Sequence, residues 1–185
     1  MKKTVLKYGI IGGLIMAVCF ALSVPLSGDP VNYDTMEIIG YGSIILSLIA
    51  IFFGIKSYRD QQLGGCLPFR KGVLIGIGIS AIASAFLGVY TFIHIAWIDP
   101  GFVESYSAWE VEKIESGEMA ANEKQKAIQE IEEMKVAYAS PLIQGLVMYA
   151  TVFLMGIVIS LISAAILKRG GGDKGEEMNF LAEST

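Results

Sequence analysis

The sequence predicts an all-α integral membrane protein: a bundle of four transmembrane helices with an extracytoplasmic amphipathic helical hairpin between the third and the fourth. Two observations support this fold class. Hydrophobic residues make up 54% of the 185-residue chain and charged residues only 17%, against about 25% charged in an ordinary soluble domain. In addition, four apolar stretches are long enough to cross a bilayer as helices, which takes about 20 residues each.

The four predicted spans contain no Asp, Glu, Lys or Arg in their cores. They run from about 8 to 26, 38 to 55, 72 to 98 and 141 to 167. Helix is the suitable conformation because each backbone polar group in hydrocarbon needs a partner within its own segment. Pro141 suits a first helical turn, and Lys56 and Lys168 suit the negative C-terminal ends of helices.

Basic residues near the helix ends predict the orientation of the bundle. They precede the first span, lie between the second and third, and follow the fourth: Lys2, Lys3, Lys7, Lys56, Arg59, Arg70, Lys71, Lys168 and Arg169. The connection 27–37 has acidic residues and no basic ones. Since cytoplasmic loops are enriched in Lys and Arg, we expect both termini in the cytoplasm.

The first segment has an alternative interpretation as a cleaved signal peptide. It follows basic residues, and Ala21-Leu22-Ser23 has the small-x-small form of a cleavage site. The apolar run exceeds a usual signal-peptide core and continues past this site through Val24. We therefore favour a retained span.

Residues 99–140 form an acidic segment, predicted outside the cytoplasm, with ten acidic and four basic residues and a local net charge of −6. Asp99-Pro100 and Gly117 predict the start and stop of one helix, and Asn122 to Gln125 resembles a capping box for a second. Apolar residues recur at helical spacing in both: Phe102, Tyr106, Trp109 and Ile114, then Ala127, Ile128, Ile131, Met134 and Tyr138. These stripes either pack together in a hairpin or form a docking surface anchored by Trp109 and Tyr106.

Small residues recur every four positions in three of the spans. In the third they are Gly72, Gly76, Ser80, Ser84 and Gly88, in the fourth Gly156, Ser160 and Ala164, and in the first Gly9, Gly13, Ala17 and Ala21. This spacing forms a groove on one helix face and allows close helix–helix approach. We expect helix packing there, with the partner helix in the same chain or in another copy.

The single histidine, His94, lies one turn from Tyr90 near the outer end of the third span. An ionisable residue in a span is a candidate functional residue. We expect the ring to reach interfacial water and form hydrogen bonds there; a proton-relay role is the alternative.

The sequence lacks the motifs of common catalytic and binding sites. It has no phosphate-binding loop, dinucleotide fingerprint or zinc-protease motif, and the acidic segment lacks the spacing of a calcium loop. We therefore expect no catalytic residues, cofactor or metal site. Because the chain is acidic, nucleic acid is not expected as a partner.

One part of the sequence is similar to a known family. The run Met36-Glu37-Ile38-Ile39-Gly40-Tyr41, the helix exit from Phe52 to Asp60 (FFGIKSYRD), the pair Gly64-Gly65 and the basic start from Phe69 to Gly72 resemble bacterial inner-membrane proteins of the domain of unknown function DUF4199. The resemblance covers most of residues 1–169, although Cys66-Leu67-Pro68 departs from the pattern. It implies a multi-pass protein of the bacterial inner membrane and no assigned activity.

These observations predict a membrane domain over residues 1–169 and a disordered cytoplasmic tail over 170–185, which is Gly-rich and charged. We expect a non-enzymatic scaffold or accessory protein in contact with the lipid bilayer. It would act through helix packing and its outer hairpin, as a homo-oligomer or with a protein partner. The alternative is a small oligomeric channel or transporter lined by the hydroxyls of Ser80, Ser84, Ser160, Ser163 and Tyr90.

Overall fold

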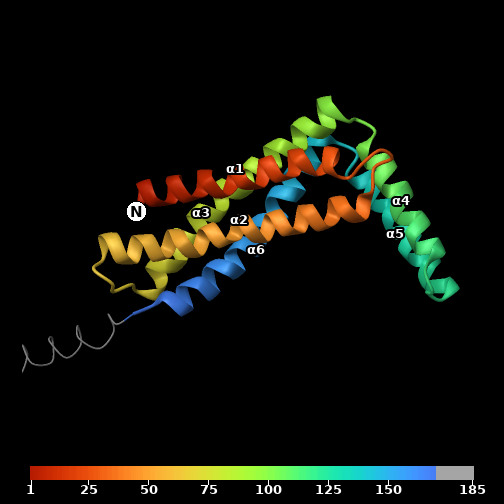
Figure 1. Ribbon diagram of the computed structural model, residues 1–185. Helices are drawn as coiled ribbons and strands as arrows, with labels where there is room; N and C mark the ends of the chain where they lie inside the picture. The colour runs from red at the N-terminus through yellow and green to blue at the C-terminus, as the bar shows by residue number, and fades with distance from the viewer. Residues whose placement is uncertain (170–185) are drawn as a thin grey trace, which may run out of the picture.

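The computed structural model describes residues 1–169, and in this range the chain is helical throughout apart from its short connections (Figure 1). It contains six α-helices and one short π-helix. Four of the helices are long and apolar enough to cross a membrane. The all-α class and the four long apolar helices predicted from the sequence are thus confirmed, whereas the predicted disordered tail lies outside the described residues.

The long helices are α1 (Lys2–Leu26), α2 (Tyr33–Gln62), α3 (Phe69–Ile93) and α6 (Pro141–Leu167), and the π-helix η1 (His94–Ile98) continues α3. Two shorter helices, α4 (Phe102–Ser116) and α5 (Ala121–Ala137), connect η1 to α6. Helix α2 begins before its apolar run because the Asn32 side chain accepts a 3.0 Å hydrogen bond from the backbone N–H of Thr35, a usual N-cap.

The α2–α3 pair lies between the other two long helices. Helix α1 packs on α2 and α3, and α6 packs on α3 and α2. The fully buried side chains at the centre come from all four: Met16, Ile51, Ile55, Ile75, Ile79, Leu87 and Val152. A single apolar core therefore joins the four helices.

Large apolar side chains also cover the outside of the bundle. Leu14, Ile45, Phe53, Leu154 and Ile166 are among many that are exposed. Soluble proteins rarely expose continuous apolar surfaces of this kind. The exposed belt is suited to contact with lipid tails.

The two ends of the bundle differ in charge and in contacts. At the end that carries the N-terminus and the α2–α3 loop, here called the basic end, the Gln62 amide donates a 2.9 Å hydrogen bond to the Thr4 hydroxyl. The backbone N–H of Leu67 there bonds to the carbonyl of Arg169 at 3.1 Å. Helices α4 and α5 lie side by side at the opposite end, here called the acidic end (Figure 1).

The predicted caps of α4 and α5 are wrong, although the predicted stop of α4 at Gly117 is found. Asp99 follows the π-helix outside the helical conformation, and its carbonyl, not its side chain, accepts a hydrogen bond from the N–H of Phe102 at 3.2 Å. Asn122 lies inside α5, whose N-cap is Ala120 without a side-chain cap. Local sequence patterns thus misplaced both helix starts by a few residues, a common size of error for helix boundaries.

Candidate functional site at the acidic end of the bundle

The small-residue stripes of α3 and α6 face each other within one chain. A β-carbon at Gly72 would lie 3.0 Å from that of Ala164, and one at Gly76 would lie 2.6 Å from that of Ser160. One at Gly156 would likewise overlap Ser80. From Gly72 to Ser80, each step of four residues along α3 is therefore matched by a step of four residues back along α6.

The remaining members of these stripes lie along the same contact. A β-carbon at Gly88 would lie 2.8 Å from the carbonyl oxygen of Gly145. The Ser84 and Ser160 hydroxyls are buried and donate to carbonyls of their own helices, Ser84 to Ser80 at 2.7 Å and Ser160 to Gly156 at 2.6 Å. In α1, Gly9 and Gly13 face Ile82 and Phe86 of α3.

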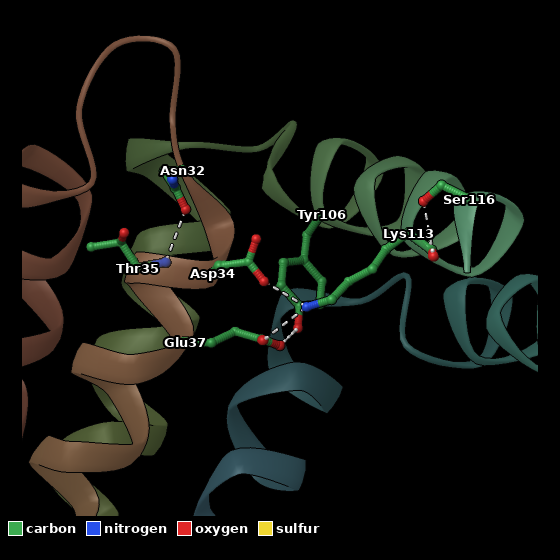
Figure 2. A network of polar contacts seen from close by, with 7 residues as sticks. All are labelled: Asn32, Asp34, Thr35, Glu37, Tyr106, Lys113 and Ser116. Atoms are coloured by element: carbon green, nitrogen blue, oxygen red, sulfur yellow. Dashed lines mark hydrogen bonds and ion pairs between the residues drawn. The ribbon is translucent and has the colours of Figure 1, made fainter. Parts of the chain in front are cut away.

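Helix α4 is held to the start of α2 by two polar side chains, Tyr106 and Lys113 (Figure 2). The Tyr106 hydroxyl donates a 2.7 Å hydrogen bond to the Glu37 carboxylate. The Lys113 ammonium lies 2.6 Å from the Asp34 carboxylate and 3.8 Å from that of Glu37. We call this set of four residues the α2–α4 clamp.

Aromatic rings reinforce the clamp. The Tyr33 ring lies 5.6 Å from that of Tyr106 and 5.4 Å from that of Trp109, between ring centroids. The Lys113 ammonium lies 4.3 Å from the centroid of the Trp109 ring, within range of a cation–π contact. Tyr106 and Trp109, considered above as docking anchors, therefore contact α2 of their own chain.

Two residues of the clamp, Tyr106 and Lys113, and Glu110 beside it have raised pKa values. Burial, together with the hydrogen bond to Glu37, raises the pKa of the Tyr106 phenol. The hydrogen bond to Asp34 raises the pKa of the Lys113 ammonium. Burial and the neighbouring Glu37 raise the pKa of the Glu110 carboxyl, so negative charge is disfavoured at this position.

A cavity of about 450 Å³ lies beside the clamp, between α2, the α3–η1 junction and α6, and beneath α4 and α5. Its polar lining includes Glu37, Tyr106, Glu110, Lys135 and Gln144, and its apolar lining includes Phe20, Ile44, Met148, Val152 and Met155. The volume falls in the usual range for small-molecule sites, about 300–1,000 Å³. The acidic end is therefore hollow, whereas the α3–α6 contact is closely packed.

His94 is part of the cavity wall and is only 7% exposed. Its ring stacks on Tyr90 with centroids 5.6 Å apart and meets the edge of Phe102 at 5.5 Å. Neither ring nitrogen has a hydrogen-bond partner within residues 1–169. The expectation that His94 reaches interfacial water is wrong, because Phe102 at the start of α4 covers it.

The backbone at His94 is also unusual. The π-helix begins at this residue, and the N–H of Asp99 bonds to the His94 carbonyl at 2.8 Å. Single π-turns in otherwise α-helical segments are frequent at functional sites. Here the wider turn joins the wall of the cavity to the segment that leads into α4.

The described part of the chain has no cluster of three metal-ligating side chains, and Cys19 and Cys66 are free thiols. The sequence reasoning missed the cavity and the clamp. The available signal was the pair Asp34 and Glu37, three residues apart near the start of α2. This pair was used only to predict the orientation.

The fold and the site define a multi-pass helical membrane protein with a cavity at one end of its bundle. The chain belongs to the family described as "Protein of unknown function (DUF4199)", which matches residues 7–169. Comparisons with curated proteins and with solved structures gave no match, so no activity can be transferred from a relative.

Proposed function

We propose that the protein is a non-enzymatic membrane accessory protein that presents α4 and α5 to a partner protein. In this proposal α4 and α5 form an extracytoplasmic hairpin, both termini are cytoplasmic, and the membrane is the bacterial inner membrane. The distribution of Lys and Arg at the basic end supports this orientation.

One observation carries the proposal: the clamp holds α4 in a fixed position while the acidic side of the α4–α5 pair stays exposed. Tyr106 and Lys113 contact α2, whereas Glu112, Glu115, Glu130, Glu132 and Glu133 are exposed. Lys135 and Lys126 lie 3.5 and 3.9 Å from the carboxylates of Glu104 and Glu130. The remaining excess of negative charge is complementary to a basic partner surface.

The experiment is photo-crosslinking in native membranes. Benzoylphenylalanine would replace Glu112 and, separately, Glu133, with Leu154 on the lipid-facing side of α6 as the matched control position. We expect a discrete protein adduct from both hairpin positions and none from the control. Reversing Glu130, Glu132 and Glu133 to Lys should abolish the Glu112 adduct, with a smaller loss on replacement by Gln.

Two results would overturn the proposal. One is the absence of any hairpin adduct from correctly inserted protein. The other is an adduct that persists unchanged after the charge reversal. In either case α4 and α5 would act only as a cover for the acidic end.

No observation favours the alternative of a channel or transporter. Of the five residues considered for a pore, Ser80, Ser84, Ser160 and Ser163 are buried in the bundle. The fifth, Tyr90, lines the cavity, where its ring stacks on His94. Ser84 and Ser160 bond to backbone carbonyls. Within one chain they therefore support helix packing, and solute flux into proteoliposomes is expected to stay at the lipid background.

A further inference from the structure

The cavity at the acidic end opens toward the lipid-facing side of the bundle. Its exposed lining residues include Tyr41 of α2, which is 63% exposed, and Met155 of α6, which is 40% exposed. Thr151 of α6 is exposed beside them. Both helices are apolar spans at these positions, so a molecule dissolved in the bilayer could enter between them.

The inner wall offers unsatisfied hydrogen-bonding groups. A neutral imidazole has one donor and one acceptor nitrogen, and in His94 neither has a partner among the described residues. Leaving a buried polar group unpaired costs stability. A ligand head group with a hydroxyl, carbonyl or N–H group would satisfy at least one of these nitrogens once the Phe102 ring that covers them moves aside.

The charge of the lining selects against anions. The carboxylates of Glu37 and Glu110 face the cavity, against one ammonium, that of Lys135. That ammonium lies 3.5 Å from the Glu104 carboxylate, which reduces its availability. The raised pKa of the Glu110 carboxyl agrees with an environment that disfavours further negative charge.

We propose that this cavity binds an uncharged amphipathic molecule from the bilayer, with its hydrogen-bonding head group at His94 and its apolar body over Ile44, Met148 and Met155. The two methionines provide an adaptable apolar surface. The site is independent of the proposed docking function, because it lies under α4 and α5 and not on their exposed acidic side.

The test uses two probes that share a ring skeleton and differ in charge: uncharged N-phenyl-1-naphthylamine and 8-anilino-1-naphthalenesulfonate. Binding is read as tryptophan-sensitised emission in phosphatidylcholine nanodiscs. The full chain carries Trp97→Phe, so that Trp109 is the only donor; its ring lies 5.4 Å from that of Tyr106, which lines the cavity.

We expect saturable emission with the uncharged probe and at least about tenfold weaker binding of the sulfonate. His94→Phe should lower the affinity for the uncharged probe about tenfold, which is equivalent to the loss of one hydrogen bond of about 1.4 kcal/mol. The thermal unfolding midpoint of the His94→Phe variant should stay equal or rise, because the substitution removes unpaired nitrogens. A loss of probe binding in this variant would then not be caused by a folding defect. Thr151→Phe at the opening should block binding, and Leu154→Phe, exposed on the same helix, should not.

Non-saturable emission that is equal in the Thr151→Phe and Leu154→Phe variants would overturn the proposal, since it would reflect partition into lipid alone. Equal affinity for both probes, or unchanged binding in His94→Phe, would overturn the assignment of the ligand class. Native mass spectrometry distinguishes which class of molecule from the membrane occupies the cavity. A neutral lipid or a non-lipid lipophile excluded by Thr151→Phe supports the site, and an anionic phospholipid excluded by it contradicts the site.

Discussion

The Tyr106 hydroxyl on α4 donates a 2.7 Å hydrogen bond to the Glu37 carboxylate near the start of α2. The two residues are far apart in the sequence, and this bond helps to fix α4 over the end of the bundle. It also places Tyr106 between the cavity and the aromatic cluster with Tyr33. The position of α4 therefore depends directly on α2.

Replacing Tyr106 by Phe removes this hydrogen bond and keeps the ring. We expect a loss of about 1–2 kcal/mol of stability, as for a partly buried hydrogen bond to a charged group. Hydrogen exchange in α4 should increase more than in α3 and α6. Tyr33→Phe is the matched control, because it keeps the ring against Tyr106 and leaves the Glu37 bond intact. Equal exchange in both variants would contradict the clamp.

Lys113→Met removes the ion pairs with Asp34 and Glu37 and the contact with Trp109. Because the group is exposed, we expect only a small loss of stability, and a smaller one at high salt. Thermal unfolding in detergent at two salt concentrations measures both effects. Lys126→Met is the control, since its one ion pair is the exposed contact with Glu130, and its effect should be smaller. A loss that is independent of salt would speak against an electrostatic role for Lys113.

Gly76→Leu should destabilise the bundle by about 1–3 kcal/mol or more, because overpacking forces the neighbouring helix away. The added side chain would meet Ser160 of α6. Gly42→Leu provides the control: a β-carbon there meets no atom within 4 Å, and loss of a helical glycine is mildly favourable. Size-exclusion chromatography after heating measures the thermal unfolding midpoint of each of the two variants. Similar midpoints would mean that α3 and α6 do not pack closely at Gly76.

Glu110→Gln tests the electrostatics beside the cavity. A carboxyl whose folded-state pKa is raised binds its proton more tightly in the folded protein, so stability falls as the pH rises from about 4.5 through the folded pKa. The variant should therefore gain stability at pH 7 and none at pH 4. Thermal midpoints at both pH values measure this, with Glu112→Gln on the exposed side of α4 as the control. A gain at pH 4 as large as at pH 7 would exclude this explanation.

Single cysteines at Gly76, Ser84, Gly156 and Ser160 test whether the small-residue faces join two copies of the chain. In a background without Cys19 and Cys66, we expect no crosslinked dimers in native membranes, because these positions are buried between α3 and α6. The double variant with cysteines at Gly72 and Ala164 should instead form an intrachain crosslink, since these β-carbons would lie 3.0 Å apart and the helices need to separate only slightly to reach the about 3.8 Å of a disulfide. Dimers from one face would favour an oligomer.

Much of the fold could be predicted because its signal is local. The spans are long uninterrupted apolar runs, and a bilayer permits few structures other than helix for them. The four-residue spacing from Gly72 to Gly88 indicated a packing face, but the spacing alone could not identify the helix opposite it. Only the structure matches Gly76 with Ser160.

The cavity depends on long-range geometry and could not be predicted in this way. His94 was expected at the water interface because its depth was judged from its distance to the end of the span. Its burial comes from Phe102, which the π-helix and the turn at Asp99 place against its ring. The partner of Tyr106 likewise depends on how α4 turns back onto α2.

The matched faces of α3 and α6 also have a mechanical consequence. Neither helix can slide along the other by less than a full four-residue repeat, about 6 Å, without forcing side chains into backbone. Helices α3 and α6 thus move as one rigid unit. The opening between α2 and α6 can therefore widen only if α2 moves away from this unit. Because the Glu37 carboxylate on α2 accepts the hydrogen bond from Tyr106 on α4, such a movement of α2 would also displace α4. It would thereby change the direction in which the acidic surface of α4 and α5 faces.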